Sequence, residues 1–229
     1  MSPGAPSDAN IVESWRHNVD AWTAAVRERR IESRELVTDG AIVDAVLSRS
    51  PRSVLDIGCG EGWLGRALAA RGIQVLGIDV VAGLIERAKA AGGGDFCVAS
   101  YDEVAAGALG FTADVVVCNV SLLGRESVDT VFAAMPALLK LHGGLIIQTL
   151  HPMVAGGDQP YQDGWREGSW AGFSADFTNP APWYFRTLAS WLALLATHRL
   201  RLLELREPLH PRTQQPASVI FIADAAGPT

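Results

Sequence analysis

Two short stretches of this chain combine glycine and aspartate at spacings that suit ligand binding. In Asp56-Ile57-Gly58-Cys59-Gly60, an apolar run that starts at Val54 leads into glycines at alternate positions. A second apolar run, 73–78, ends at Asp79, which comes 21 positions after Gly58. Alternate glycines let a ligand lie against bare backbone. In nucleotide-binding α/β units a carboxylate at the second position accepts ribose hydroxyls, so we expect an adenosine-containing cofactor.

The charge of the loop discriminates between two such cofactors. A dinucleotide-binding loop has a third glycine, and counting from Gly58 that position holds Trp63. Asp56 would also repel a pyrophosphate, because a protein interior screens charge poorly. S-adenosylmethionine has no phosphate and carries a sulfonium and an ammonium, so an acidic floor favours it over NAD.

The motif D-I-G-C-G-E-G over 56–62, with Asp79 after the next strand and Asn119 after a later one, resembles class I S-adenosylmethionine-dependent methyltransferases of the bacterial small-molecule type. The resemblance covers about 53–149 and continues more loosely through two further strands. It implies an α/β fold with a doubly wound, seven-stranded, mostly parallel sheet whose last strand is antiparallel. It also implies that the cofactor lies over the carboxyl ends of the strands.

Apolar periodicity gives the same alternation of elements. We expect strands at 54–58, 74–79, 96–99, 114–119, 144–150, 202–207 and 218–223, and helices at 62–71, 82–91, 127–141 and 187–199. Strands that alternate with helices indicate parallel pairing with right-handed crossovers. Before the first strand, one helix carries Trp15, Val19, Trp22 and Val26 on a stripe, and a second runs from about 33 to 47.

Composition limits the class of protein. The chain has 229 residues, of which 48% are hydrophobic and 19% charged, as is typical of one globular domain. We expect a single domain over 1–229, with an N-terminal helical cap over 1–50 and a substrate-lid insertion over 151–186. A net charge of −6 without a long Lys/Arg cluster disfavours nucleic acid as a partner.

Location and assembly are predicted more coarsely. No apolar helical run is long enough to span a membrane, and the N-terminus lacks the pattern of a signal peptide. The three cysteines lack metal-ligand spacing, so we expect reduced thiols in a cytoplasmic monomer or homodimer and no metal.

Several residues are candidates for binding the cofactor. Asp79 would accept the ribose hydroxyls, and Asp56 would face the amino end of the cofactor or act through water. Arg34 could clamp the cofactor carboxylate or pair with a neighbouring glutamate. The full set is Arg34, Asp56, Gly58, Cys59, Gly60, Asp79, Val80, Ser100, Tyr101, Asn119 and Val120.

The adenine and methionine contacts are less certain from the residues alone. The resemblance implies an acid after the third strand, and Ser100 stands there, with Tyr101 able to pack on the base. Asn119 either lines the methionine pocket or orients a nucleophile. Trp15 and Trp22 are either core residues or contacts to the cofactor or substrate.

Residues 151–186 form a connection that is too long and too aromatic for a plain loop, so we expect a lid. His151 directly follows the fifth strand and is a candidate general base, or only part of a turn with the proline after it. His210 in the final loop is a second candidate. Tyr184 and Arg186 would hold a substrate carboxylate or phenolate, or else serve lid packing.

The predicted reaction is transfer of a methyl group from S-adenosylmethionine to a small-molecule acceptor, with S-adenosylhomocysteine as the product. Oxygen and nitrogen are the expected nucleophiles, and aromatic, partly cationic walls suggest a small, flat or acidic acceptor. Two alternatives remain open, which are a non-catalytic S-adenosylmethionine-binding protein and, with less support, an NAD-dependent oxidoreductase.

Overall fold

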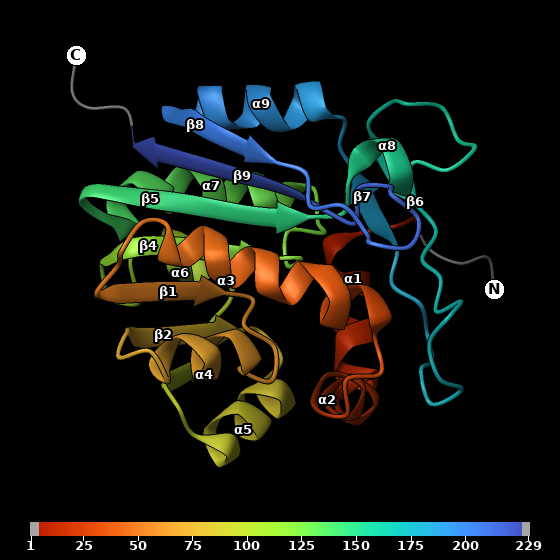
Figure 1. Ribbon diagram of the computed structural model, residues 1–229, viewed down its shortest axis with the longest axis horizontal. Helices are drawn as coiled ribbons and strands as arrows, with labels where there is room; N and C mark the ends of the chain where they lie inside the picture. The colour runs from red at the N-terminus through yellow and green to blue at the C-terminus, as the bar shows by residue number, and fades with distance from the viewer. Residues whose placement is uncertain (1–4, 226–229) are drawn as a thin grey trace.

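The computed structural model describes residues 5–225, and a seven-stranded sheet forms its centre (Figure 1). The strands lie in the order β3-β2-β1-β4-β5-β9-β8. Strands β1 to β5 pair in parallel, and β9 is antiparallel to both of its neighbours. The strand bounds are Ser53–Ile57 (β1), Gln74–Asp79 (β2), Asp95–Val98 (β3), Ala113–Asn119 (β4), Leu139–Thr149 (β5), Leu200–Arg206 (β8) and Val219–Ala225 (β9). The predicted sheet is confirmed.

Helices cover both faces of this sheet, and the two apolar cores record which helix lies on which face. One core packs α7 and α9 against the sheet, with Phe132 and Trp191 among its buried side chains. The other packs α3 and α4, with Ile42 and Leu64. The bounds are Asp39–Leu47 (α3), Trp63–Ala69 (α4), Ala82–Ala91 (α5), Tyr101–Ala105 (α6), Glu126–Leu138 (α7) and Leu188–Thr197 (α9). Burial from both sides explains why the central strands are almost continuously apolar.

The remaining elements gather at the carboxyl ends of the parallel strands, at the right of Figure 1. They are α1 (Asp8–His17), α2 (Val19–Arg27), the π-helical turn Arg34–Thr38 that leads into α3, α8 (Pro152–Ala155), and the hairpin of β6 (Gly164–Arg166) and β7 (Trp183–Phe185). The N-terminal helices and the insertion after β5 are therefore on the same side of the molecule.

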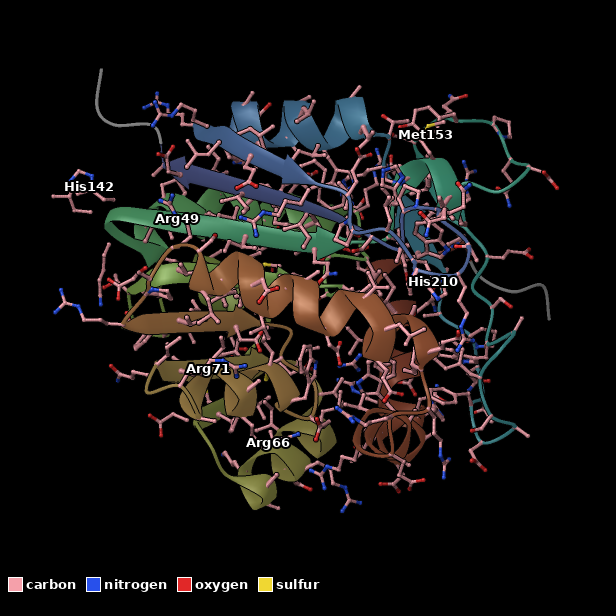
Figure 2. The ribbon with its side chains drawn as sticks, viewed as in Figure 1. Arg49, Arg66, Arg71, His142, Met153 and His210 are labelled. Atoms are coloured by element: carbon pink, nitrogen blue, oxygen red, sulfur yellow. The ribbon has the colours of Figure 1, made fainter. Side chains whose placement is uncertain are left out.

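Two elements differ from the sequence prediction. The helix expected to carry Trp15 and Trp22 is two helices, because the chain turns at Asn18, whose side chain is completely buried. The helix expected to reach 141 ends at Leu138, and β5 begins at Leu139. His142 has a left-handed backbone there, in a bulged segment that projects from the far end of the sheet in Figure 2.

Candidate functional site

A cavity of about 470 Å³ lies where β1, β2, β4 and β5 end. Its floor is the loop after β1 and the ends of β2 and β4, and its cover comes from α1 and α2. All eleven residues predicted to bind the cofactor are in its wall, namely Arg34, Asp56, Gly58, Cys59, Gly60, Asp79, Val80, Ser100, Tyr101, Asn119 and Val120.

The glycine loop brings backbone, rather than side chains, to the cavity floor. Gly58 and Gly60 have φ angles of 75° and 57°, which only glycine adopts without strain. The amides of Gly58 and Cys59 both donate to the carbonyl oxygen of Ile78, at 2.8 and 2.9 Å, so the loop is fixed against the end of β2. A Cβ atom at Gly58 would clash with Ser121, which leaves no room for a side chain there.

Asp56 is the most unusual polar group of the floor. Its side chain is 1% exposed, and neither carboxylate oxygen has a hydrogen-bond partner among the described residues. Burial, with a smaller contribution from the neighbouring charge of Asp79, raises its pKa to about 7. A buried, unpartnered carboxylate is costly unless a ligand completes it, so this position is suited to a cationic or hydrogen-bond-donating group.

Asp79 is held in place by two backbone amides. Its Oδ2 atom accepts from Gly60 N at 3.0 Å, and its Oδ1 atom accepts from Val81 N at 2.9 Å. Burial raises the pKa of Asp79, and these hydrogen bonds oppose the rise. Each oxygen retains a lone pair, so a bidentate contact to a pair of hydroxyls is available.

Arg34 reaches the cavity from the π-helical turn. It pairs with Asp39, through Nε to Oδ1 at 2.9 Å, and not with Glu32 or Glu35. Its guanidinium lies 5.4 Å from the ring centre of Trp22 and 4.8 Å from that of Trp63. Its Nη1 atom is buried and unpartnered among the described residues, so one donor remains for a ligand oxygen.

The structure uses Ser100 differently from the sequence expectation. Its hydroxyl accepts from Glu103 N at 3.2 Å, and its backbone amide donates to Glu103 Oε2 at 2.7 Å, which forms a capping box at the start of α6. A contact to adenine through this hydroxyl would compete with the cap. Tyr101 lies in the wall, where its hydroxyl donates to Ser121 O at 3.0 Å, and burial raises its pKa well above the usual range.

Glu61, in the same glycine loop, is completely buried and neutralised from two sides. Arg66 of α4 donates to Oε1 at 2.6 Å, and Arg27 of α2 donates to Oε2 at 2.9 Å. The second pair connects the N-terminal helices directly to the loop.

Comparison with known proteins agrees with this geometry. Residues 54–143 match the family model described as "Methyltransferase domain". The ubiquinone biosynthesis O-methyltransferase of Xanthomonas oryzae pv. oryzae is 33% identical over 114 residues, which is 48% of this chain and 47% of the relative. The chain thus spans about half the length of the curated relatives it matches.

Solved structures extend the likeness to most of the chain. An S-adenosylmethionine-dependent methyltransferase from Mesorhizobium loti has a TM-score of 0.60 at 20% identity, over 80% of this chain and 95% of that one. Magnesium protoporphyrin IX methyltransferase from Synechocystis, solved with bound SAH, has a TM-score of 0.64 at 19% identity, over 94% and 99%. The chain therefore shares the fold of these methyltransferases, and its residues 54–143 match the methyltransferase family model.

The four residues predicted to be catalytic, His151, Tyr184, Arg186 and His210, lie outside the cavity wall. His151 is buried, and its Nε2 atom is 2.7 Å from Glu207 Oε1. His210 Nδ1 accepts hydrogen bonds from the backbone amides of Arg212 and Thr213, at 3.3 and 3.4 Å, within its own loop. His210 is labelled at the right of Figure 2. Neither histidine lines the cavity, and His151 Nδ1 is buried without a partner among the described residues, so the general-base role stays a prediction.

Arg186 and Tyr184 support the wall from behind. Arg186 donates to the carbonyl oxygens of Gly124 and Arg125, at 2.8 and 3.1 Å, and the backbone amide of Tyr184 donates to Leu123 O at 2.8 Å. Both residues thus hold the loop after β4. The guanidinium of Arg186 is engaged with this loop, whereas Tyr184 is bonded to it only through its backbone amide, so binding of a substrate acid by these two residues stays a prediction.

The sequence predicted that the N-terminal helices and the insertion cover the site, but it did not identify most of the individual residues that line the cavity from these segments. Ile11 and Val12 of α1 line the cavity, as does Phe173 of the insertion. Asp8 accepts from the amides of Arg125 and Ser127, at 2.8 and 2.7 Å, and so fastens α1 to the start of α7. Trp15 and Trp22, for which two interpretations were open, are both in the wall.

Within residues 5–225, no helix is long and apolar enough to cross a bilayer. No group of three or more His, Cys, Asp or Glu side chains in that range is arranged to hold a metal ion.

Proposed function

We propose that this protein transfers a methyl group from S-adenosylmethionine to a small-molecule acceptor. The observation that carries the proposal is the buried Asp56 carboxylate, which has no hydrogen-bond partner among the described residues and lies beside a glycine loop with no room for a side chain at Gly58. A cofactor with positive charge and no phosphate completes that carboxylate, whereas a pyrophosphate would be repelled by it.

Each end of the cofactor has a suitable partner in the cavity. Asp79 would accept the ribose hydroxyls, since both its oxygens are fixed by backbone amides. Arg34 would donate its free Nη1 to the cofactor carboxylate. Asp56 would face the ammonium, directly or through water. Asn119, at the end of β4, would line the methionine pocket.

When bound, the cofactor supplies an activated methyl group on a cationic sulfur. The protein contributes orientation and exclusion of water, and α1, α2 and Phe173 already cover the cavity. Holding two reactants at attack distance can lower a barrier by roughly 7–11 kcal/mol. The name of the matched relatives, ubiquinone biosynthesis O-methyltransferase, supports a small-molecule acceptor here without fixing the atom that is methylated.

The proposal is tested by calorimetric titration with S-adenosylhomocysteine and, separately, with NADH. We expect heat with S-adenosylhomocysteine and none with NADH, and the opposite pattern would replace the proposal with a dinucleotide enzyme. Binding of S-adenosylmethionine without methylation of any member of a broad acceptor panel would indicate a non-catalytic binding protein.

A further inference from the structure

The cavity has two ends that differ in chemistry. The cofactor end holds the glycine loop and Asp79. The other end lies over β5 and β9, where Thr149 pairs with Val219, so Thr149 and Ser218 are neighbours across the sheet and both line the cavity. The apolar wall of this second end, here called the acceptor end, is completed by Ile11, Val12, Leu123 and Leu150.

Charge in the cavity wall is strongly one-sided. Five carboxylates line it, which are Asp8, Asp39, Asp56, Asp79 and Asp102. Arg34 is the single cation among the described lining residues, and it is paired with Asp39 at 2.9 Å. Neither histidine nor lysine occurs among those lining residues. Carboxylates therefore outnumber cations in the wall, and the field inside the cavity is negative at a pH above the raised pKa of Asp56, which is about 7.

The cations that the sequence placed near the acceptor are engaged elsewhere. Arg166 donates to the carbonyl oxygens of Pro160 and Gln162, at 2.8 and 3.0 Å, within the insertion. Arg186 donates to two carbonyl oxygens of the loop behind the wall. Neither lines the cavity, so the predicted cationic walls are not found among the described lining residues, and the charge of the acceptor stays a prediction.

Two kinds of acceptor are disfavoured by these facts. A carboxylate, phosphate or phenolate would bring a second negative charge into a low-dielectric space that is already negative. A neutral alcohol would need a base to become a strong nucleophile, and both His151 and His210 lie outside the cavity wall. The lining carboxylates are already committed: Asp56 and Asp79 to the proposed cofactor, Asp39 to Arg34, Asp8 to two backbone amides, and Asp102 to the first turn of α6. An uncharged nitrogen base meets neither obstacle, because its lone pair is available without deprotonation.

We infer that the methyl acceptor is an uncharged nitrogen base, either an amine or a nitrogen heterocycle, on a flat apolar body. This inference rests on the proposed methyl transfer. The flat body packs between the aliphatic side chains of the acceptor end and the rings of Trp15 and Phe173. The hydroxyls of Thr149 and Ser218 lie at this end and can hydrogen-bond a polar edge.

The transfer balances without another reactant. The nitrogen lone pair forms the new C–N bond while the C–S bond breaks, and sulfur keeps the bonding pair as a neutral thioether. Positive charge moves from sulfur to nitrogen, so the carboxylates face one new cation in place of another. If the nitrogen carries a hydrogen, that proton leaves to solvent after the transfer.

The test uses the whole protein saturated with S-adenosylhomocysteine and three probes of matched size, which are isoquinoline, 2-naphthol and 2-naphthoate. We expect calorimetry to show isoquinoline binding at least about tenfold more tightly than 2-naphthoate. Equal or reversed affinities, or no binding of isoquinoline, would overturn the inference. With S-adenosylmethionine, methylation of 2-naphthol or 2-naphthoate in preference to isoquinoline would also overturn it.

A charge-insertion variant gives a second readout. Leu150 lines the cavity and is 41% exposed, so Leu150→Lys adds a cation at the acceptor end with little disturbance of packing. It should tighten 2-naphthoate binding by about tenfold, whereas Leu209→Lys, at an exposed position outside the wall, should leave it unchanged. An unchanged affinity in Leu150→Lys would count against the inference. Absence of S-adenosylhomocysteine binding by the wild type would instead refute the proposed function.

Discussion

The cofactor end and the cover of the cavity are built from contacts of different range. At the cofactor end, Gly60 and Asp79 are 19 positions apart and are joined by one hydrogen bond. In the cover, Asn18 binds Thr178, 160 positions away, through Nδ2 to O at 2.7 Å and through Oδ1 from N at 2.9 Å. A contact between positions 19 apart can be recognised in the sequence as a motif with fixed spacing, whereas a contact between positions 160 apart has no such sequence signal.

Aromatic packing reinforces the same difference. Trp15 of α1 lies 5.0 Å from Trp22 and 5.8 Å from Trp170, and Trp170 lies 4.8 Å from Phe177, measured between ring centres. These rings join the N-terminal helices to the insertion. The cover is therefore one packed unit made from two distant segments, whereas the floor is a single local motif.

The largest effect should come from Gly58→Ala at the floor. The substitution combines a positive φ with a clash against Ser121 and should destabilise the protein by about 2–4 kcal/mol. Calorimetry should show S-adenosylhomocysteine affinity reduced on the order of 100-fold, because the loop must shift. Gly72→Ala is the matched control, since Gly72 has φ of 79° but nothing within 4 Å of an added Cβ. Equal losses in both variants would mean that backbone strain alone explains the result.

The second effect concerns pH and Asp56. Its pKa in the folded protein is about 7, against 3.8 ordinarily, so the folded state holds the proton more tightly. Stability from this group is complete below about pH 4 and is lost as pH rises through 7. The free energy of unfolding without ligand should fall by about 3 kcal/mol between about pH 5 and 8 from Asp56, and the raised pKa of Asp79 acts in the same direction.

Asp56→Asn checks this directly, by chemical denaturation across that pH range. The variant should show a flatter profile and weaker S-adenosylhomocysteine binding, by about tenfold. Asp158→Asn, at an exposed position of the insertion, should match the wild type. A wild-type profile that rises with pH would contradict the assigned shift.

In the cover, Asn18→Ala should have an intermediate effect. It removes bonds to Ser14 O and to both backbone groups of Thr178, and leaves buried polar groups unpaired at a cost of about 2–3 kcal/mol. Hydrogen exchange should speed up in α1 and around 178 together. Asn10→Ala, at an exposed position of α1, is the control. Faster exchange in α1 alone would show that the two segments are not one unit.

A smaller change is expected for Ser100→Ala, which separates the two interpretations of this residue. Loss of the capping box should lower the free energy of unfolding by about 1 kcal/mol, with S-adenosylhomocysteine affinity held within about twofold. An affinity loss well beyond the loss of stability would restore the adenine contact.

The smallest effect should come from His151→Ala. Because the ring lies outside the cavity wall and is bonded to Glu207, cofactor affinity should stay within about twofold of wild type. Turnover measured across pH should keep its profile. Loss of one limb of that profile would assign His151 a proton-transfer role after all.

The sequence was sufficient for the floor because its signals are local. Asp56, the alternate glycines and Asp79 were predicted from spacing, and their side chains line one cavity. The capping role of Ser100 also had a local signal, since Glu103 follows it by three positions as a capping box requires. This spacing indicates a helix cap at Ser100 and gives no indication of a contact to adenine.

The cover could not be predicted in the same way. That Trp15 faces the cavity, and that Arg186 binds carbonyl groups rather than a ligand, depends on which surfaces meet after folding. In the sequence, a stripe of tryptophans or an arginine among aromatic residues is compatible with packing in the core, with packing in a lid, or with a contact to a ligand. Only the three-dimensional packing discriminates between these outcomes.

The double pairing of Glu61 has a consequence for how molecules enter and leave. If α2 lifts away, the bond to Arg27 breaks, but Arg66 still neutralises the buried carboxylate. Since Arg27 is already 41% exposed, water readily solvates the released guanidinium. Opening of the N-terminal helices would therefore leave no unpaired charge inside the protein, as the entry and exit of the proposed cofactor would require.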